Sequence, residues 1–185
     1  MSQPRITFKM VLLGNPSVGK TAIRERYLGL GFIGKYNMTI GADFALKRVA
    51  VNETLYVMQI WDLAGQSGFT STRSLYYRGA MAALLVFDIS RPETFHKLNN
   101  WIHEILDNRG EYIPIILVGN KSDLRETSTN TVSKRQARRY ARKITEETGF
   151  ETPYIETSAL TGEGVDEAFL TMIQNVSEVI KEEER

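Results

Sequence analysis

The eight residues GNPSVGKT, at positions 14–21, constrain this chain more than any other stretch of its sequence. A G-x-x-x-x-G-K-T loop binds phosphate when it stands between a buried strand and a helix. Here an apolar run ends at Gly14, and Ile23, Tyr27 and Leu30 follow at helical spacing. The glycines let the backbone close around an anion, and the start of a helix presents unpaired N–H groups to it. The alternative is a chance glycine-rich turn, and the loop alone does not choose between ATP and GTP.

This phosphate loop assigns roles to individual side chains. Lys20 is expected to reach the β- and γ-phosphates of a nucleotide, and the Thr21 hydroxyl is expected to ligate Mg²⁺. The residues expected to contact the nucleotide in this segment are Asn15, Ser17, Val18, Gly19, Lys20, Thr21 and Ala22.

The remaining sequence alternates strand-like and helix-like patterns. The run AALLVFD, at 82–88, is apolar up to its last residue, as a strand buried on both faces is, and two further strand-like runs end at Asn120 and Ala159. Two other runs are joined at Asn52 and Glu53 and predict a hairpin.

Helical patterns lie between the strand-like runs. Ser90 and Glu93 have the spacing of a capping box at the start of one helix, and a basic helix is expected over 133–148. The last helix carries one apolar face, formed by Val165, Phe169, Met172, Ile173, Val176 and Ile180. Together these patterns predict one α/β domain over residues 1–185, with a mostly parallel sheet covered by helices on both faces. In such folds ligands bind at the carboxyl ends of the strands, where each motif of this sequence stands.

The composition argues against several classes of function. The 23 basic and 22 acidic residues give no reason to expect bulk nucleic-acid binding. The chain has no cysteine, so a disulfide, a cysteine nucleophile and a prenyl anchor are all excluded for the chain as written. We expect no signal peptide and no membrane-spanning run. We therefore expect a cytoplasmic protein, with membrane association only through a partner or through a lipidated tail missing from this chain.

The segment GNKSD, which ends at Asp123, predicts recognition of guanine. One carboxylate can accept both the N1–H and the N2 amino hydrogens of guanine, and adenine offers no such pair of donors. Asn120 can bond the base and tie its loop to the phosphate loop, while the Lys121 stem can cover one face of the ring. At the end of the next strand the Ala159 N–H can bind the guanine carbonyl, and Ser158 can hold that loop. For N-K-x-D alone, an Asx-rich turn is the alternative.

The segment WDLAGQ, at 61–66, closes another strand and carries groups that can sense a γ-phosphate. Asp62 is expected to hold Mg²⁺, the Gly65 N–H to bond the γ-phosphate, and Gln66 to orient the attacking water. Thr39 can ligate Mg²⁺ and bond the same phosphate. Loss of the γ-phosphate would then release both loops, which is an order–disorder switch. The residues expected to act in catalysis are Gln66, Lys20 and Thr39.

In this order and spacing, the phosphate loop, Thr39, DLAGQ, NKSD and TSA resemble the Ras superfamily of small GTPases over about residues 8–181. TIGADF, IWDLAGQ and YYRGA are similar to the Rab subfamily in particular. The resemblance implies a P-loop NTPase fold, with a six-stranded mostly parallel sheet, one antiparallel hairpin strand and five helices. It also implies slow hydrolysis of GTP to GDP with Mg²⁺, a molecular switch of the membrane-traffic type, and switch loops around 32–44 and 65–79.

Further roles follow from the resemblance alone. It implies additional nucleotide contacts at Phe32, Tyr36, Leu124 and Leu160, with Phe32 stacked across the guanine and Tyr36 closing over the phosphates. It implies an effector-binding aromatic triad, formed by Phe44, Trp61 and Tyr76. A monomer that meets an exchange factor and a GTPase-activating protein is expected. For the two loop aromatics plain loop packing is the alternative, and for the triad it is burial in the core.

Several positions depart from the family pattern. Pro16 has no N–H and a fixed φ, so we expect GTP binding to survive and activation by a partner's arginine to be blunted. Ser67 and Gly68 replace an acidic–basic pair and predict a looser loop. Arg73 and Arg78 have the spacing of helix-surface residues rather than of a catalytic arginine.

The chain ends in IKEEER, without the prenylated cysteines that such proteins carry. Either that tail is missing from this chain, or its lineage does not use prenyl anchors. The basic helix raises a second alternative, between a solvated surface and a weak contact to anionic lipid, for the face formed by Arg135, Arg138, Arg139 and Arg142.

Two other functional classes compete with the GTPase switch. A P-loop ATPase or nucleotide kinase would share the phosphate loop, but Asp123 argues for guanine. A nucleotide-binding scaffold that does not cycle would need neither Gln66 nor Thr39.

Overall fold

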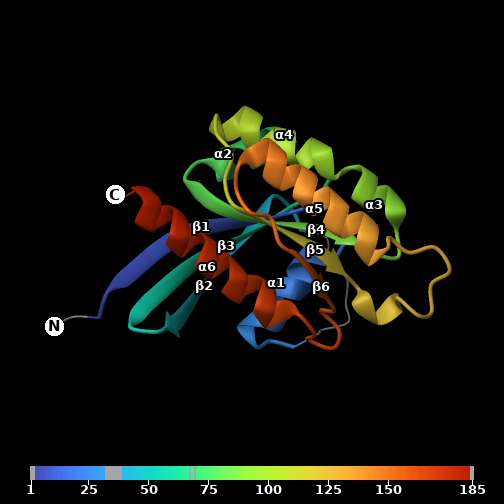
Figure 1. The fold of residues 1–185 in the computed structure, drawn as a ribbon, viewed down its shortest axis with the longest axis horizontal. Coiled ribbons are helices and arrows are strands. Elements are labelled where there is room, and N and C mark those ends of the chain that lie inside the picture. Colours follow the sequence, from blue (N-terminus) through green and yellow to red (C-terminus); the bar gives the residue numbers. More distant parts are fainter. Residues whose placement is uncertain (1–2, 32–38, 67, 69, 184–185) are drawn as a thin grey trace.

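Six strands form one sheet at the centre of the molecule (Figure 1). The computed structural model describes residues 3–31, 39–66, 68 and 70–183. In chain order the strands are β1 (Arg5–Leu13), β2 (Ala42–Val51), β3 (Thr54–Leu63), β4 (Ala80–Asp88), β5 (Ile115–Asn120) and β6 (Tyr154–Thr157). Their order across the sheet is β2-β3-β1-β4-β5-β6, and only the β2–β3 pair is antiparallel. This confirms the predicted mostly parallel sheet with one antiparallel hairpin strand.

Helices cover both faces of this sheet, as the sequence predicted (Figure 1). They are α1 (Lys20–Leu28), α2 (Thr70–Tyr77), α3 (Pro92–His96), α4 (Leu98–Arg109), α5 (Lys134–Thr148) and α6 (Val165–Glu183), with a 3₁₀ turn, η2, at Ser122–Leu124. Helices α1 and α6 pack on one face, and α2, α4 and α5 pack on the other. None of the helices in the described part of the chain is long and apolar enough to span a bilayer.

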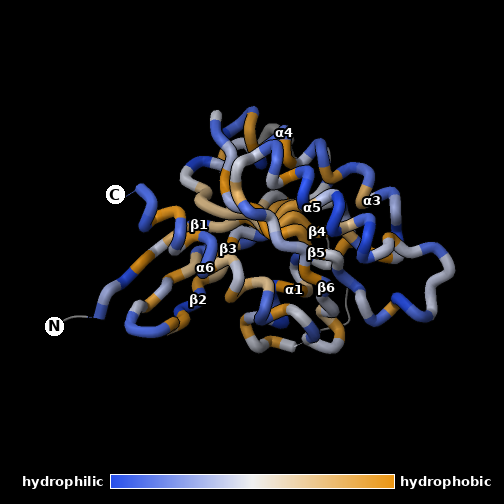
Figure 2. Tube along the Cα trace, in the orientation of Figure 1, coloured by the Kyte–Doolittle hydropathy of each residue, from blue (hydrophilic) through white to orange (hydrophobic). Residues whose placement is uncertain are grey.

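Strand β4 shows why its sequence is apolar almost throughout. Alternate side chains, such as Leu84 and Leu85, enter the two opposite cores, and both are fully buried. A strand in the middle of the sheet therefore has no solvent-facing side. The hydropathy of the chain follows the same plan, with the apolar strands gathered at the centre (Figure 2).

The helix expected after Ser90 begins at a different residue from the one predicted, and it is divided into two helices. The Ser90 hydroxyl donates to Asp88 Oδ1 at 2.6 Å and caps no helix, so the predicted capping box is wrong. The helix begins instead at Pro92, whose missing N–H costs nothing in a first turn. Lys97 separates α3 from α4, so the two correspond to the single helix that the sequence indicated.

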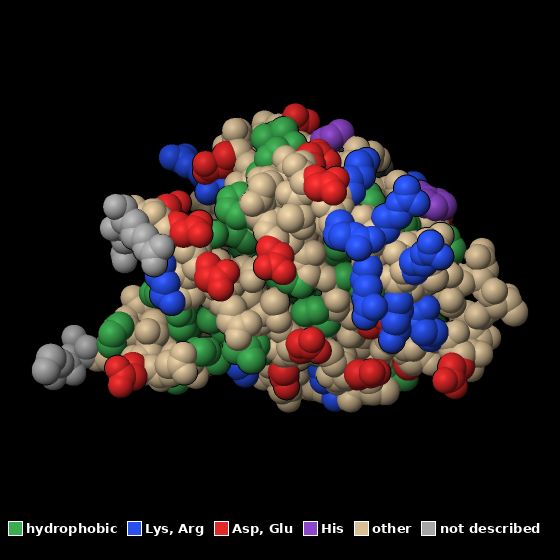
Figure 3. Space-filling view, viewed as in Figure 1, with side chains coloured by type: hydrophobic (Ala, Val, Ile, Leu, Met, Phe, Trp, Pro, Cys, Tyr) green, Lys and Arg blue, Asp and Glu red, His purple; other side chains and the backbone are tan. Residues whose placement is uncertain are grey.

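Two other local predictions are confirmed. The β2–β3 turn lies at Asn52, which adopts a left-handed φ of 54°. Helix α5 begins after Ser133, close to its predicted start. The Ser133 hydroxyl accepts from the Gln136 N–H, and the Gln136 side chain accepts from the Ser133 N–H. These two bonds form a capping box, which the sequence analysis had not named. Its predicted basic face is exposed and gathers Lys and Arg on one side of the molecule (Figure 3).

Helix α6 is held by an aromatic stack in the core. The ring of Phe169 lies parallel to that of Tyr27 on α1, with 3.7 Å between the ring centroids. Phe169 is fully buried, whereas the next residue, Leu170, is 43% exposed.

We expect Phe169→Ala to lower the free energy of unfolding by about 3–5 kcal/mol, because it opens a cavity and removes the stack. Leu170→Ala is the matched control, and it should change this free energy by less than about 1 kcal/mol. Urea unfolding followed by circular dichroism measures both. Equal losses for the two variants would contradict this account of the core.

Candidate functional site

The predicted motifs meet at one edge of the sheet. The phosphate loop follows β1, the segment of residues 64–66 follows β3, and the ends of β4, β5 and β6 lie beside them. Because parallel strands all end at the same edge, groups far apart in the sequence come together there.

The glycines of the phosphate loop stand where no side chain would fit. A Cβ on Gly14 would lie 2.1 Å from the Val86 carbonyl oxygen, and one on Gly19 would lie 2.2 Å from Asn120 Nδ2. Both glycines also have positive φ angles, 139° and 98°. The backbone of the loop therefore curves tightly, as an anion cradle requires.

Lys20 fills the inside of this curve. Its Nζ donates to the carbonyl oxygens of Gly14 at 2.7 Å and Asn15 at 3.1 Å. Burial lowers the pKa of Lys20 to about 8, although the charge of Asp62 acts in the opposite direction. A buried ammonium group bonded to two neutral carbonyls is well placed to receive an anion.

Three oxygen-bearing side chains converge beside Lys20, as predicted for a magnesium site. The Thr21 hydroxyl donates to Asp62 Oδ2 and lies 3.1 Å from the Thr39 hydroxyl. The other carboxylate oxygen of Asp62 is buried without a hydrogen-bond partner among the described residues, and burial raises the pKa of this carboxyl. Hydroxyl and carboxylate oxygens are ligands that Mg²⁺ prefers, so the donor set fits this ion.

Within the described ranges, no group of three or more His, Cys, Asp or Glu side chains is arranged to hold a metal ion. Thr21, Thr39 and Asp62 offer two hydroxyls and one carboxylate, and Mg²⁺ commonly completes such a set with phosphate oxygens and water.

Asn120, at the end of β5, connects the phosphate loop to the end of β6. Its Nδ2 donates to the Val18 carbonyl at 2.8 Å, which ties β5 to the phosphate loop as the sequence suggested. Its Oδ1 accepts from the Thr157 hydroxyl at 3.0 Å and from the Ala159 N–H at 3.3 Å. The Ala159 N–H predicted to meet a base carbonyl thus points at Asn120, and its contact with a base stays a prediction.

Asp123 is held in an exposed position. The Ser158 hydroxyl donates to its Oδ1, and the same hydroxyl accepts from the Thr161 N–H at 3.1 Å. Arg26 on α1 holds the turn at residues 159–160. Its Nε donates to the Ala159 carbonyl at 2.9 Å, and its Nη2 donates to the Leu160 carbonyl. The sequence analysis missed Arg26, since nothing local indicates a contact between α1 and this turn.

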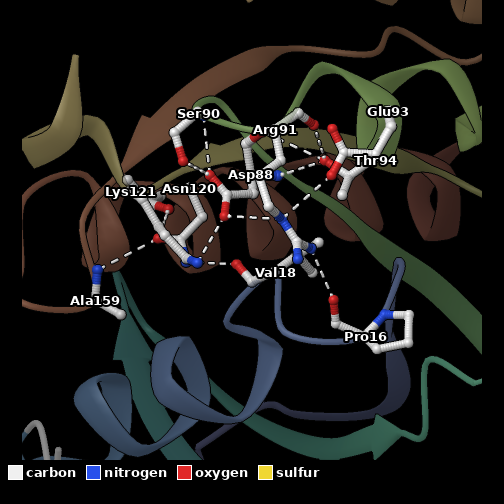
Figure 4. A network of polar contacts seen from close by, with 11 residues as sticks. Pro16, Val18, Asp88, Ser90, Arg91, Glu93, Thr94, Asn120, Lys121 and Ala159 are labelled. Carbon is white, nitrogen blue, oxygen red and sulfur yellow. Dashed lines mark hydrogen bonds and ion pairs between the residues drawn. The ribbon is translucent and has the colours of Figure 1, made fainter. Parts of the chain in front are cut away.

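Asp88 at the end of β4 anchors a polar network that the sequence analysis also missed (Figure 4). Its Oδ2 lies 2.6 Å from Lys121 Nζ and 3.4 Å from Arg91 Nε. Arg91 in turn donates to the Pro16 carbonyl at 2.9 Å, so the network reaches the outside of the phosphate loop. The one signal in the sequence was a carboxylate closing an otherwise apolar strand at the ligand edge.

The position of Lys121 agrees with part of its predicted role. Its backbone has a left-handed φ of 66°, and its ammonium group is paired with Asp88. The charged end of the side chain is thereby held, and the stem lies between this ion pair and the backbone of its loop. Its contact with a base stays a prediction.

At Gly65 the segment of residues 64–66 lies directly against the backbone of the phosphate loop. A Cβ on Gly65 would lie 2.6 Å from three backbone atoms, which belong to Gly14, Asn15 and Pro16. The predicted γ-phosphate sensor therefore already lies against the loop that it is expected to work with.

Arg73 is not on the helix surface, so that prediction is wrong. Its side chain is buried and forms an ion pair with Glu104 on α4, with Nε 2.7 Å from Oε1. Arg78 is exposed, as expected.

The structure describes the predicted aromatic triad but not the two predicted loop aromatics. The rings of Phe44, Trp61 and Tyr76 form one continuous cluster, with centroid separations of 4.9 and 5.3 Å, and Phe44 is 44% exposed. Phe32 and Tyr36 lie outside the described residues, as does Ser67.

Other predicted nucleotide contacts lie at this edge as well. The Asn15 side chain accepts from Trp101 Nε1 at 3.1 Å, and Ser17 is exposed with a left-handed φ of 62°. Leu124 lies in η2, where its N–H donates to the Lys121 carbonyl at 2.9 Å. Val18 is buried and Ala22 half-buried.

Asn120→Ala should lower the free energy of unfolding of the ligand-free protein by about 2–4 kcal/mol, because three hydrogen bonds at a buried position are lost. Asn175→Ala removes one exposed and long bond, at 3.4 Å, and serves as the control. Thermal and urea unfolding without nucleotide measure the difference. If the two variants were equally stable, Asn120 would not join these loops.

Comparison with known proteins places this geometry in a family. The family model described as "Ras family" matches residues 9–178. Ras-related protein RABG3e of Arabidopsis thaliana is 37% identical over 187 aligned residues, which cover 99% of this chain and 88% of that protein. Ras-related protein Rab7 of Pisum sativum is also 37% identical, with the same coverage of both proteins. Ras-related protein Rab7 of Drosophila melanogaster is 38% identical over an alignment that covers 95% of this chain and 83% of that protein.

Proposed function

This chain belongs to the Ras family of small GTPases, and we propose that the edge of the sheet described above is where it binds and hydrolyses GTP. It is a Rab-like GTPase, a GTP-dependent switch of the kind that acts in membrane traffic. Proteins of this family bind GTP or GDP with Mg²⁺.

One observation carries the assignment. Lys20 is buried inside a glycine loop, and the oxygen cluster of Thr21, Thr39 and Asp62 lies on the side where the loop opens. The ammonium group and the N-terminus of α1 together favour the β- and γ-phosphates. Thr21, Thr39 and Asp62 would hold Mg²⁺, which when bound offsets the charge of the phosphate oxygens.

Guanine recognition is assigned to the ends of β5 and β6. The Asp123 carboxylate is exposed and its Oδ1 is oriented by Ser158, so the remaining lone pairs of its two oxygens can accept the two donors of the guanine edge. Lys121 and Asn120 would flank the base, and Leu124, Ala159 and Leu160 would line the rest of its site. By family resemblance, Phe32 would stack across the guanine and Tyr36 would close over the phosphates.

Hydrolysis requires little covalent work from the protein. Gln66 would orient the attacking water, while the Gly65 N–H and Lys20 would stabilise the charge on the γ-phosphate. We expect slow intrinsic turnover, on the order of 10⁻⁴ to 10⁻² s⁻¹, by analogy with other GTPases of this kind.

The partners follow from the family, and their docking sites are proposals. We place effector binding on the cluster of Phe44, Trp61 and Tyr76, which presents an aromatic surface beside the switch segments. An exchange factor and a GTPase-activating protein would act on the segments around 32–44 and 65–79 of a monomeric single-domain protein. We expect it to work in the cytoplasm and to reach membranes through a partner or a lipidated tail.

Competition binding tests the proposed function directly. Unlabelled GTP and GDP should displace a fluorescent GDP from the protein, and ATP at a thousandfold higher concentration than GDP should not. Displacement by ATP at comparable concentration would favour the ATPase or kinase alternative. Binding without phosphate release would favour the scaffold.

Asp123→Asn should exchange guanine for xanthine specificity. An amide accepts from the N1–H and donates to the extra carbonyl of xanthine, whereas its NH₂ group would face the N2 amino group of guanine. Loss of the guanine contact should weaken GDP binding at least about a hundredfold, because buried donors would be left unpaired. Competition between GDP and xanthosine diphosphate measures the change. Undiminished preference for GDP would remove Asp123 from the base site.

Pro16 is expected to blunt activation by an arginine-donating partner. Pro16 lies where the phosphate loop meets both Gly65 and Arg91, and it offers no N–H to a nucleotide. Single-turnover hydrolysis by the wild type and Pro16→Gly, each with and without an arginine-donating GTPase-activating protein, measures the effect. Activation should be larger for the variant, and equal activation of both would exclude this role for Pro16.

A further inference from the structure

Arg73 is a fully enclosed cation that the reaction outlined above does not use. It is 2% exposed, and its Nε and Nη2 donate to the two carboxylate oxygens of Glu104 at 2.7 and 2.8 Å. Its guanidinium lies 4.6 Å from the ring centroid of Trp101, also on α4. Such a two-pronged pair over an aromatic ring fixes both the position and the plane of the guanidinium.

The third nitrogen of this guanidinium faces the γ-phosphate sensor. Arg73 Nη1 donates to the carbonyl oxygens of Ala64 at 2.9 Å and Gln66 at 2.6 Å. Gly65 lies between these two residues in the sequence. A single nitrogen atom of Arg73 therefore holds both neighbours of Gly65. The orientation of the Gly65 N–H and the starting point of the Gln66 side chain therefore depend on Arg73.

Helix α4 connects this contact to the phosphate loop. Trp101 Nε1 donates to Asn15 Oδ1 at 3.1 Å, while the ring of the same residue lies against the Arg73 guanidinium. The buried Tyr77 hydroxyl donates to Glu104 at 2.9 Å and restrains the carboxylate that Arg73 grips. The phosphate loop is thus bonded to Trp101 directly, and the segment of residues 64–66 is connected to Trp101 and Glu104 through Arg73.

We propose that Arg73 is a positioning residue that holds Gly65 and Gln66 ready for the γ-phosphate. In this role Arg73 acts through the two carbonyls that it fixes, and not through a contact of its own with the nucleotide or the water. The segment of residues 64–66 would then be braced by α4 before GTP arrives, so the γ-phosphate has less backbone to order. This inference rests on the proposed function, since it assigns a role within the same site.

The chemistry of this position requires arginine. Five donors in a plane can serve a carboxylate and two carbonyls together, and lysine has three donors on a single nitrogen. Removing the guanidinium also leaves Glu104 largely buried with one partner fewer, so the helix contact and the loop contact are lost together.

The test compares Arg73→Met with Arg138→Met, the same change on the exposed face of α5. Single-turnover hydrolysis of GTP should slow about tenfold in Arg73→Met, because Gln66 is no longer held in place. GTP should also bind more weakly relative to GDP, since only GTP uses the Gly65 N–H. Arg138→Met should match the wild type in both measurements, and Arg73→Lys should lie between.

A double-variant cycle separates positioning from general destabilisation. In a Gln66→Ala background the hydrolysis rate is already low, and adding Arg73→Met should lower it by less than about twofold if Arg73 acts through Gln66. Glu104→Gln removes the charge that Arg73 pairs with but keeps a hydrogen-bonding side chain at this position of α4. It should slow hydrolysis and weaken GTP binding in the same way as Arg73→Met, but to a smaller extent. This variant tests the proposal if Arg73→Met does not fold.

The outcomes distinguish this inference from the proposed function. Equal weakening of GTP and GDP binding, together with a full additional loss of rate in the Gln66→Ala background, would make Arg73 a structural residue only. An unchanged hydrolysis rate in Arg73→Met and Glu104→Gln would overturn the positioning role while GTPase activity stands. Absence of GTP binding and hydrolysis in the wild type would overturn the proposed function itself.

Discussion

The close backbone contact between the phosphate loop and its neighbours is the constraint on which the rest of the site depends. Gly14 lies against β4, Gly19 lies against Asn120, and Gly65 lies against the loop itself, each with no room for a Cβ. These contacts fix N–H groups and carbonyls before any ligand is present. Fixed dipoles need not reorganise during binding or reaction, which makes them effective toward phosphate charge.

Charge in this protein is divided between groups that are paired and groups that are left available. Arg73 is matched to Glu104 and Lys121 to Asp88, so these charges hold the framework. Within the described part of the chain, the partners of Lys20 Nζ are two carbonyl oxygens, and one oxygen of Asp62 has no hydrogen-bond partner there. These two groups lie together at the ligand edge, and both keep hydrogen-bonding or ligating capacity there, which suits their assignment to phosphate and Mg²⁺.

Most of the fold could be predicted from the sequence, because buried parallel strands and the phosphate loop are local patterns. The ligand edge followed from the same patterns, since the phosphate loop, WDLAGQ, GNKSD and TSA each stand at the end of a strand. Arg73 was mistaken for a surface residue because its burial depends on Glu104, thirty-one positions away on another helix. Arg91 and Arg26 were missed for the same reason, and the start of α3 was misplaced because Ser90 serves Asp88 instead of a helix.

Amide hydrogen exchange with different nucleotides tests the central claim most directly, namely that this edge binds guanine nucleotides and senses the γ-phosphate. GDP with Mg²⁺ should slow exchange in 14–21, 120–124 and 158–160, where the phosphate loop and the base site are placed. A non-hydrolysable GTP analogue should add protection at Thr39 and Gly65. Protection elsewhere, or the same pattern with adenine nucleotides, would contradict the account.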